Sequence, residues 1–167
     1  LDRGEHVVSK LGKQPDNSLS TCAKVSAQVR IRTLMQRRNL LGALNRYAQR
    51  HPDEQPTVDR FNLLLENHPN CFERDCWAGH ITGSAWLLDP SQSKLLLTHH
   101  RKLNMWLQLG GHSDGDPDTA AVAKREAEEE SGLPVTRVST EIFDIDVHDI
   151  AARKEDPERE SFDVRVR

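Results

Sequence analysis

The stretch of residues 110–133, GGHSDGDPDTAAVAKREAEEESGL, constrains the fold most, because it holds the start and stop signals of one helix. Asp116 is a favourable N-cap, and Pro117 suits the first helical position, where its fixed φ helps and its missing N–H costs nothing. Gly132 is of the type preferred just after a helix, because glycine takes the left-handed conformation without strain. These signals predict a helix of about 15 residues that ends at Ser131.

Small residues line this helix and the segment before it. Ala120, Ala123 and Ala127 recur at helical spacing and form a narrow apolar stripe, which can lie close against a sheet. Gly110 and Gly111 allow a sharp backbone turn and a close approach of the backbone to the helix. We therefore expect the glycine turn, the helix and a sheet to pack tightly together.

Three glutamates fall on one side of the same helix. Glu126, Glu129 and Glu130 are spaced i, i+3 and i+4, so we expect their carboxylates to converge. Like charges at this spacing repel, and the C-terminal end of the helix dipole adds to the cost, which a cation would relieve. Carboxylate oxygens with no nearby cysteine favour Mg²⁺ or Mn²⁺ over zinc. The plain alternative is a solvated acidic face, as in most glutamate runs.

The order of these residues resembles the signature of the Nudix hydrolase family. That signature is a glycine, five residues, a glutamate, seven residues, and then Arg-Glu-aliphatic-any-Glu-Glu-any-Gly-aliphatic. Gly111 stands at the glycine, and residues 125–133 match the second half at every defined position, with Ala127 as the aliphatic residue. Pro117 stands where the signature has its isolated glutamate. Asp116 and Asp118 flank this proline and bear acids, but a capping role competes for Asp116.

The resemblance implies a fold and an activity. The fold would be a Nudix-like α/β/α sandwich with a mixed sheet over residues 73–167, an α/β class. The activity would be Mg²⁺-dependent hydrolysis of the diphosphate bond in a nucleoside diphosphate linked to another group, with water attacking phosphorus. The group linked to the nucleotide stays unidentified, because the signature does not encode it.

The resemblance also assigns roles to individual residues. Glu126, Glu129 and Glu130 would bind Mg²⁺, with Mn²⁺ as the alternative metal. Arg125 would orient a carboxylate, and Glu129 or Glu130, or a residue on a later loop, would serve as general base. The residues expected to lie against the substrate are Gly110, Gly111 and His112.

Two other function classes stay open. A non-catalytic Nudix-like module that senses nucleotides is suggested by Pro117 and by the basic N-terminal part of the chain. A diphosphate isomerase ranks last, because its chemistry needs an additional acid and base, and no cysteine lies in the segments bordering the acidic helix.

The composition is that of one ordinary domain with a short extension. The chain has 167 residues, of which 36% are apolar, enough for one core. Residues 1–50 carry 10 Lys/Arg against 3 Asp/Glu, whereas residues 51–167 carry 13 against 23. The basic part lacks interleaved aromatic residues, so we expect a solvated extension and no nucleic acid partner.

The cysteines and the hydropathy indicate the compartment. Cys22, Cys71 and Cys76 are odd in number and lack C-x-x-C spacing, so we expect reduced thiols. No apolar run is long enough to span a bilayer, and no signal peptide is recognisable. These features predict a cytoplasmic protein without a membrane partner.

The N-terminal half is expected to be helical only from Met35. Residues 1–34 show no clear periodicity and are expected to be a disordered or non-native extension. Residues 35–72 then read as a helical appendage of two amphipathic helices, the second beginning near a capping Thr57. Such an appendage could cover the sheet or bridge a homodimer.

The remaining residues alternate between strands and turns. Residues 80–89 and 94–100 read as a hairpin, residues 105–112 as a third strand, and residues 135–150 as one or two more. Strands on both sides of the acidic helix predict a mixed sheet. Only 34 residues follow Leu133, which leaves little room for a closing helix and strand, so we expect a truncated C-terminus with an unpaired edge.

Aromatic and histidine side chains near the strand ends could meet a nucleotide. Trp86 and Trp106 could stack on a base, although a core position is the commoner role of a strand tryptophan. Three further histidines, His99, His100 and His148, could meet a phosphate or an adenine ring, although a polar residue at a strand end needs no such role.

Overall fold

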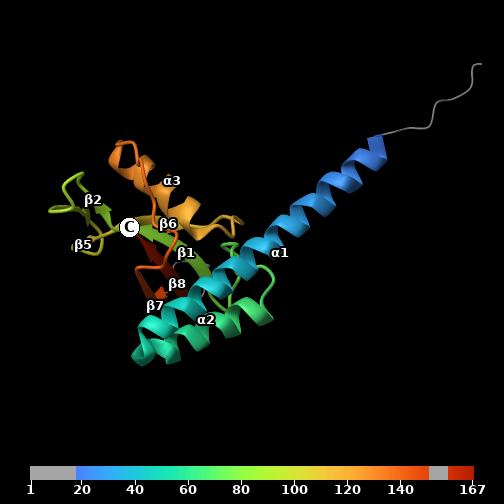
Figure 1. Ribbon diagram of the computed structural model, residues 1–167, viewed down its shortest axis with the longest axis horizontal. Coiled ribbons are helices and arrows are strands. Elements are labelled where there is room, and N and C mark those ends of the chain that lie inside the picture. Colours follow the sequence, from blue (N-terminus) through green and yellow to red (C-terminus); the bar gives the residue numbers. More distant parts are fainter. Residues whose placement is uncertain (1–17, 151–157) are drawn as a thin grey trace, which may run out of the picture. The chain divides into compact units, whose positions relative to one another are not determined.

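The computed structural model describes secondary structure for residues 18–150 and 158–167, and side chains for residues 34–150 and 158–167. By internal contacts the chain divides into two units, Leu1–Arg32 and Thr33–Arg167. All side-chain interactions described below lie in the second unit. Its central elements are labelled in Figure 1.

The first helix begins well before the predicted start at Met35. Helix α1 spans Ser18–Arg50, so residues 18–34 of the expected extension are helical, while residues 1–17 lie outside the described part. Within the second unit, Leu40, Leu44 and Tyr47 of α1 are buried, as the periodicity predicted. None of the described helices is long and apolar enough to cross a membrane.

Helix α2 spans Gln55–Asn67 and follows the short helix η1, Pro52–Glu54. Its N-cap is Glu54, with no side-chain capping bond, and a proline lies in the first turn. The predicted cap at Thr57 is therefore wrong, because the helix begins two residues earlier, at Gln55, and Pro56 already has a helical φ. The buried side of α2 consists of Val58, Phe61, Leu64 and Leu65.

Four strands form the main sheet, in the order β6-β1-β8-β7. They are β1 (His80–Ala85), β6 (Leu109–His112), β7 (Asp144–Ile150) and β8 (Arg159–Val166). β1 pairs in parallel with β8, whereas the other two pairings are antiparallel. The predicted mixed sheet is confirmed. Of the run 135–150, only β7 forms a strand.

Two small hairpins connect β1 to β6. The first pairs β2 (Leu87–Leu88) with β3 (Leu95–Leu96), and the second pairs β4 (Thr98–His100) with β5 (Met105–Leu107). The predicted hairpin is confirmed, but each of the three predicted strands 80–89, 94–100 and 105–112 breaks into two. The breaks occur at Trp86, whose N–H donates to the Val166 carbonyl (2.8 Å), at Leu97, and at Gln108, whose side chain donates to Asp163 (3.1 Å).

The helices cover one face of the sheet. Gly83 of β1 is the register partner of Val164 of β8, so both lie on the same face. A Cβ on Gly83 would lie 2.6 Å from the Thr119 carbonyl oxygen of α3, Thr119–Ser131. Val164 belongs to the core cluster built with α1 and α2. In the described residues, α3 therefore lies beside the α1 and α2 layer, and a second helical layer is not among them.

The cysteines of the second unit behave as predicted. Cys71 and Cys76 are free and buried. Burial raises the pKa of the Cys71 thiol to about 11, and burial also raises the pKa of the Cys76 thiol. Both are therefore protonated core residues at neutral pH. The side chain of Cys22 lies outside the described residues.

Candidate functional site

Helix α3 is capped by a different aspartate from the one predicted. Asp118 is the N-cap, and its side chain accepts a hydrogen bond from the Ala121 N–H (3.1 Å). Asp116 instead accepts from the Asp118 N–H (3.0 Å) and so shapes the turn before the helix. The predicted end is confirmed, because Gly132 has φ 69° and its N–H donates to the Glu128 carbonyl.

The alanine stripe holds α3 close to the sheet. Ala123 and Ala127 are fully buried, and Ala120 is packed against the same cluster. They lie over Ala85 and Leu109 of strands β1 and β6. The predicted packing of the stripe is confirmed. Because it keeps α3 close to the sheet, the polar side chains of α3 can reach β6.

The glycine pair brings the backbone of β6 against two of the glutamates. The Gly110 N–H donates to Glu130 Oε2 (3.2 Å). A Cβ on Gly111 would lie 2.2 Å from Glu126 Oε2, a distance that no side chain can occupy. Glycine at position 111 therefore permits the close approach of the Glu126 carboxylate, whereas at Gly110 an added Cβ would meet Ser84 of β1.

Arg125 connects the helix to the end of β6. Its Nη2 donates to the His112 carbonyl (3.0 Å) and to Glu126 Oε1 (2.9 Å). The Glu126 side chain is 18% exposed, so this ion pair is partly shielded from solvent. The carboxylate that Arg125 contacts is thus that of the next residue on its own helix.

The three predicted metal ligands do not converge as expected. Glu126 lies against Gly111 and Arg125, Glu130 binds the Gly110 N–H, and Glu129 is exposed. Within residues 34–150 and 158–167, no group of three His, Cys, Asp or Glu side chains is arranged to hold a metal ion. The two carboxylates next to β6, those of Glu126 and Glu130, accept hydrogen bonds from different groups of the protein, which keeps these side chains apart.

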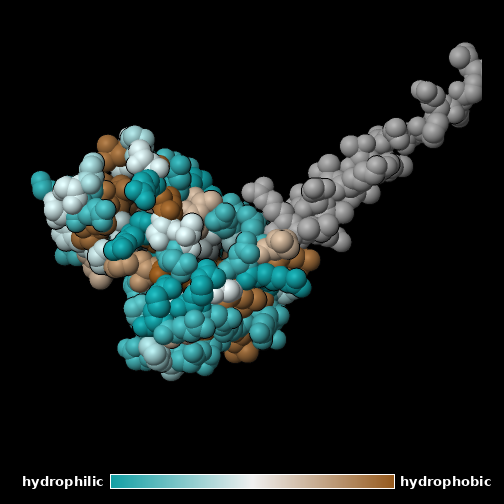
Figure 2. Space-filling model, viewed as in Figure 1, coloured by the Kyte–Doolittle hydropathy of each residue, from teal (hydrophilic) through white to brown (hydrophobic). Residues whose placement is uncertain are grey.

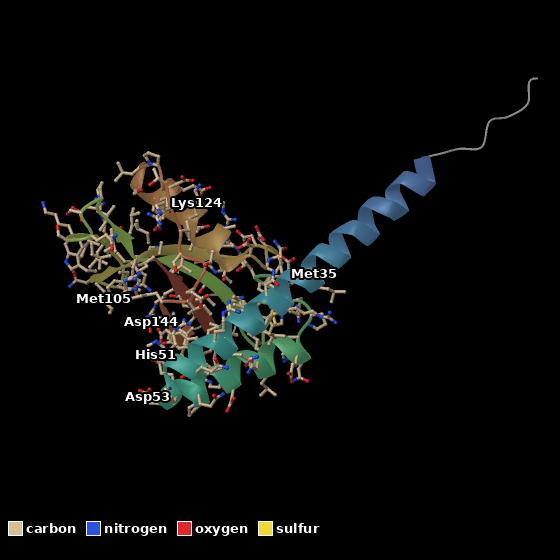
Figure 3. The ribbon with its side chains drawn as sticks, in the orientation of Figure 1. Met35, His51, Asp53, Met105, Lys124 and Asp144 are labelled. Atoms are coloured by element: carbon tan, nitrogen blue, oxygen red, sulfur yellow. The ribbon has the colours of Figure 1, made fainter. Side chains whose placement is uncertain are left out.

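The donor chemistry of the acidic face nevertheless suits Mg²⁺. This ion usually takes one or two protein carboxylates and completes its octahedron with water and phosphate oxygens. Glu129 is exposed, and no partner for its carboxylate is found among the described residues. The neighbouring Glu128 is tied differently, since it accepts from the Val135 N–H (3.0 Å) and lies 3.9 Å from Lys124 Nζ. Figure 3 labels Lys124 on α3.

His112 meets a second histidine that sequence reasoning did not single out. The rings of His80 and His112 stack with centroids 5.0 Å apart and planes at 8°. His80 is 1% exposed, and neither ring nitrogen has a partner among the described residues. Burial lowers the pKa of His80 to about 4. Burial, followed by the charge of Arg74, lowers the pKa of His112. Both rings are therefore neutral at pH 7.

A loop contact fixes the turn that follows β6. Arg74 Nη2 donates to Asp114 Oδ2 (2.8 Å), and its Nε donates to the second oxygen. The hydrogen bond from Arg74 lowers the pKa of Asp114. Gly115 has φ 84°, and its N–H donates to the Phe72 carbonyl (2.9 Å). Sequence reasoning missed this pairing, because nothing local links positions 40 residues apart.

The sheet face away from the helices carries a polar network. Asp163 is 3% exposed and accepts hydrogen bonds from four side chains. The donors are Thr82 (3.0 Å), Ser84 (2.7 Å), Gln108 (3.1 Å) and Arg165 (3.0 Å). Arg165 also reaches Asp144 (2.6 Å) and Asp146 (2.8 Å). This network is fully satisfied, so it supports the sheet without needing a ligand.

The other aromatic and histidine candidates lie in different surroundings. Trp106 is 68% exposed, so a core role for this residue is wrong. Trp86 is partly buried and packs on Phe143 at 5.3 Å. His99 lies 5.1 Å from Trp106. His100 and His148 accept or share hydrogen bonds within their own strands or turns.

No protein-family model matches this chain, and no curated protein matches it in sequence.

Proposed function

We propose that this protein is a Mg²⁺-dependent hydrolase of the Nudix type. Its substrate would be a nucleoside diphosphate linked to another group, cleaved at the diphosphate by water. The observation that carries the proposal is the fit between the glycine pair and the acidic helix. Gly110 and Gly111 place the edge backbone of β6 directly against Glu130 and Glu126, as the order of the motif requires.

The fold supports the same proposal. The acidic helix packs on a mixed four-stranded sheet and follows directly from the strand that carries the glycines. In a Nudix-like α/β/α sandwich this arrangement would place the carboxylates at a sheet edge.

Each residue of the site has a proposed role. Glu129 would hold Mg²⁺, or Mn²⁺, together with the diphosphate oxygens, and Glu126 and Glu130 would join it after turning away from Arg125 and from the Gly110 N–H. The metal would neutralise charge on the diphosphate and make water more nucleophilic. Arg125 would keep the Glu126 carboxylate in place. Glu129, exposed and unpaired among the described residues, is the glutamate best placed to take a proton from water.

The test is a screen for Mg²⁺-dependent phosphate release with a coupled phosphatase. The panel contains ADP-ribose, dinucleoside polyphosphates, NADH and nucleoside triphosphates. We expect turnover of one class, reduced at least a hundredfold by Glu129→Gln. Glu128→Gln is the matched control, because Glu128 lies next to it but pairs with Lys124. Equal activity of the wild type and Glu129→Gln would refute the assignment of Glu129 as metal ligand and general base.

A second candidate function is nucleotide sensing without hydrolysis. It is favoured by the contacts that already occupy Glu126 and Glu130, and by Pro117 at the position of the isolated glutamate. Tight nucleotide binding without turnover would support it. Pro117→Glu would then be the first change to test for gained hydrolysis, with Mg²⁺ affinity measured in parallel.

A further inference from the structure

The β4–β5 ribbon stands out from the sheet that carries the site. Its register pairs Thr98 with Leu107 and His99 with Trp106. The turn is closed at Asn104, whose φ is 52° and whose N–H donates to the His100 carbonyl (2.8 Å). Among the described residues the two strands pair only with each other, and an isolated two-stranded ribbon gains little stability from its own contacts.

Both faces of this ribbon expose apolar side chains. Met105 is 54% exposed and Trp106 is 68% exposed. They are neighbours on one strand, so they point to opposite faces. Leu103 in the turn is 53% exposed. Hydrophobic and hydrophilic residues lie side by side in this region of Figure 2, and Met105 is labelled in Figure 3. Trp106, the most exposed of the three, offers a large aromatic surface on its own face of the ribbon.

The charge of the ribbon is opposite to that of the neighbouring helix. The ribbon and its turn, residues 98–107, contain Arg101 and Lys102 and no acidic residue. Both cationic side chains are exposed. The second half of α3 carries the glutamates instead. A ribbon with cationic and aromatic side chains suits a ligand with both a π-face and phosphates.

The ribbon is joined rigidly to the glycine strand. Only Gln108 separates β5 from β6, and its side chain is bound to buried Asp163. Trp106 is four residues from Gly110, so their Cα atoms are at most about 14 Å apart. Gly110 in turn is bound to Glu130. The ribbon is thus tethered within reach of a ligand that lies on the carboxylates.

We infer that the β4–β5 ribbon is the nucleotide-binding arm of the site, a role that rests on the proposed function. Trp106, supported by His99 at 5.1 Å, would stack on the base. Arg101 and Lys102 would pair with phosphate oxygens. The ligand class is therefore a nucleoside diphosphate with an unmodified base face, and the base would be recognised by stacking rather than by its edge.

The test compares two ligands that resist cleavage at the bridging position, in the presence of Mg²⁺. One is the α,β-methylene analogue of ADP, and the other is methylenediphosphonate, which has no base. Titration calorimetry should show that Trp106→Leu weakens the ADP analogue roughly 5- to 150-fold and leaves methylenediphosphonate unchanged. Trp77→Leu is the matched control, because Trp77 is also exposed, at 52%, but lies outside the ribbon.

A second variant tests the charges. Arg101→Gln with Lys102→Gln should weaken both ligands by the same factor and reduce the salt dependence of binding. Trp106 is exposed, so circular dichroism should report an unchanged fold for all these variants.

Three results would overturn the inference. These are full affinity of Trp106→Leu for the ADP analogue, an equal loss in Trp77→Leu, and Trp106-dependent binding to anionic lipid vesicles with no preference for the nucleotide. The phosphate-release screen separates this failure from that of the proposed function. If Trp106→Leu turns over substrate with an unchanged KM, the hydrolase assignment stands and the role of the ribbon is refuted. If the protein shows neither binding nor turnover, both assignments are refuted.

Discussion

Replacing Gly111 with alanine tests the contact on which the candidate site depends. The new Cβ would lie 2.2 Å from Glu126 Oε2 and 2.5 Å from its Cδ. The carboxylate must therefore move by about 1 Å to reach an ordinary van der Waals distance. Because Arg125 holds it at 2.9 Å and is itself bound to the His112 carbonyl, this movement disturbs the link between α3 and β6.

The expected cost follows from two contributions. Overpacking a tight site costs about 1–3 kcal/mol, and weakening a partly exposed ion pair adds at most about 1 kcal/mol. We expect Gly111→Ala to lower the free energy of unfolding by about 1–4 kcal/mol, a fall in Tm of about 2–16 °C for a domain of this size. Thermal melting followed by circular dichroism measures this change.

Two controls isolate the cause. Gly42 lies within α1, where its Cβ would meet Arg46 at an ordinary 3.6 Å, so Gly42→Ala should stabilise the helix by about 0.5–1 kcal/mol. In the Glu126→Ala background the obstacle is gone, and Gly111→Ala should cost much less than in the wild type. An equal cost in both backgrounds would show that the Glu126 contact does not explain the need for glycine.

Three further predictions concern stability. Asp118→Ala should lower it by about 1 kcal/mol through loss of the helix cap, measured by urea unfolding, whereas Asp116→Ala should cost less because Asp116 bonds only the turn. Asp163→Asn should cost about 2–3 kcal/mol in the same assay, since an amide cannot accept all four hydrogen bonds; a change below 0.5 kcal/mol would contradict the network. His80 has a folded pKa of about 4 against 6.5 unfolded, so its contribution is complete above pH 6.5 and is lost as pH falls toward 4, up to about 3 kcal/mol. His80→Asn should flatten this part of the stability profile, and an unchanged slope would refute the assignment.

Local signals predicted the end of α3 but not its beginning. Gly132 needs only its own left-handed conformation to stop the helix. At the other end, Asp116 and Asp118 are both good capping residues, and the structure uses Asp118. A local pattern cannot decide between two suitable caps two residues apart.

For the strands, too, local features could be predicted from the sequence and long-range ones could not. The alternation in β8, with Phe162 and Val164 toward the core and Asp163 and Arg165 away from it, is visible in the sequence. The breaks at Trp86 and Gln108 are not, because each is caused by a bond to β8 far along the chain. The exposure of Trp106 could not be predicted from the sequence, because a tryptophan in a strand is usually a core residue. In the described residues no third strand pairs with the ribbon, and Trp106 is exposed.

The position of β6 at the sheet edge explains why the motif residues bind the protein itself. In its antiparallel pairing with β1, Gly110 and His112 are two apart, so their backbone groups point to the same side. Glu130 accepts from the Gly110 N–H and Arg125 donates to the His112 carbonyl. These α3 side chains therefore take the hydrogen bonds that a neighbouring strand would make, which protects the edge from pairing with another chain. A diphosphate with Mg²⁺ would have to share Glu130 with this edge, whereas Glu129 is not needed there. Glu129 is consequently the carboxylate whose substitution separates catalysis from folding.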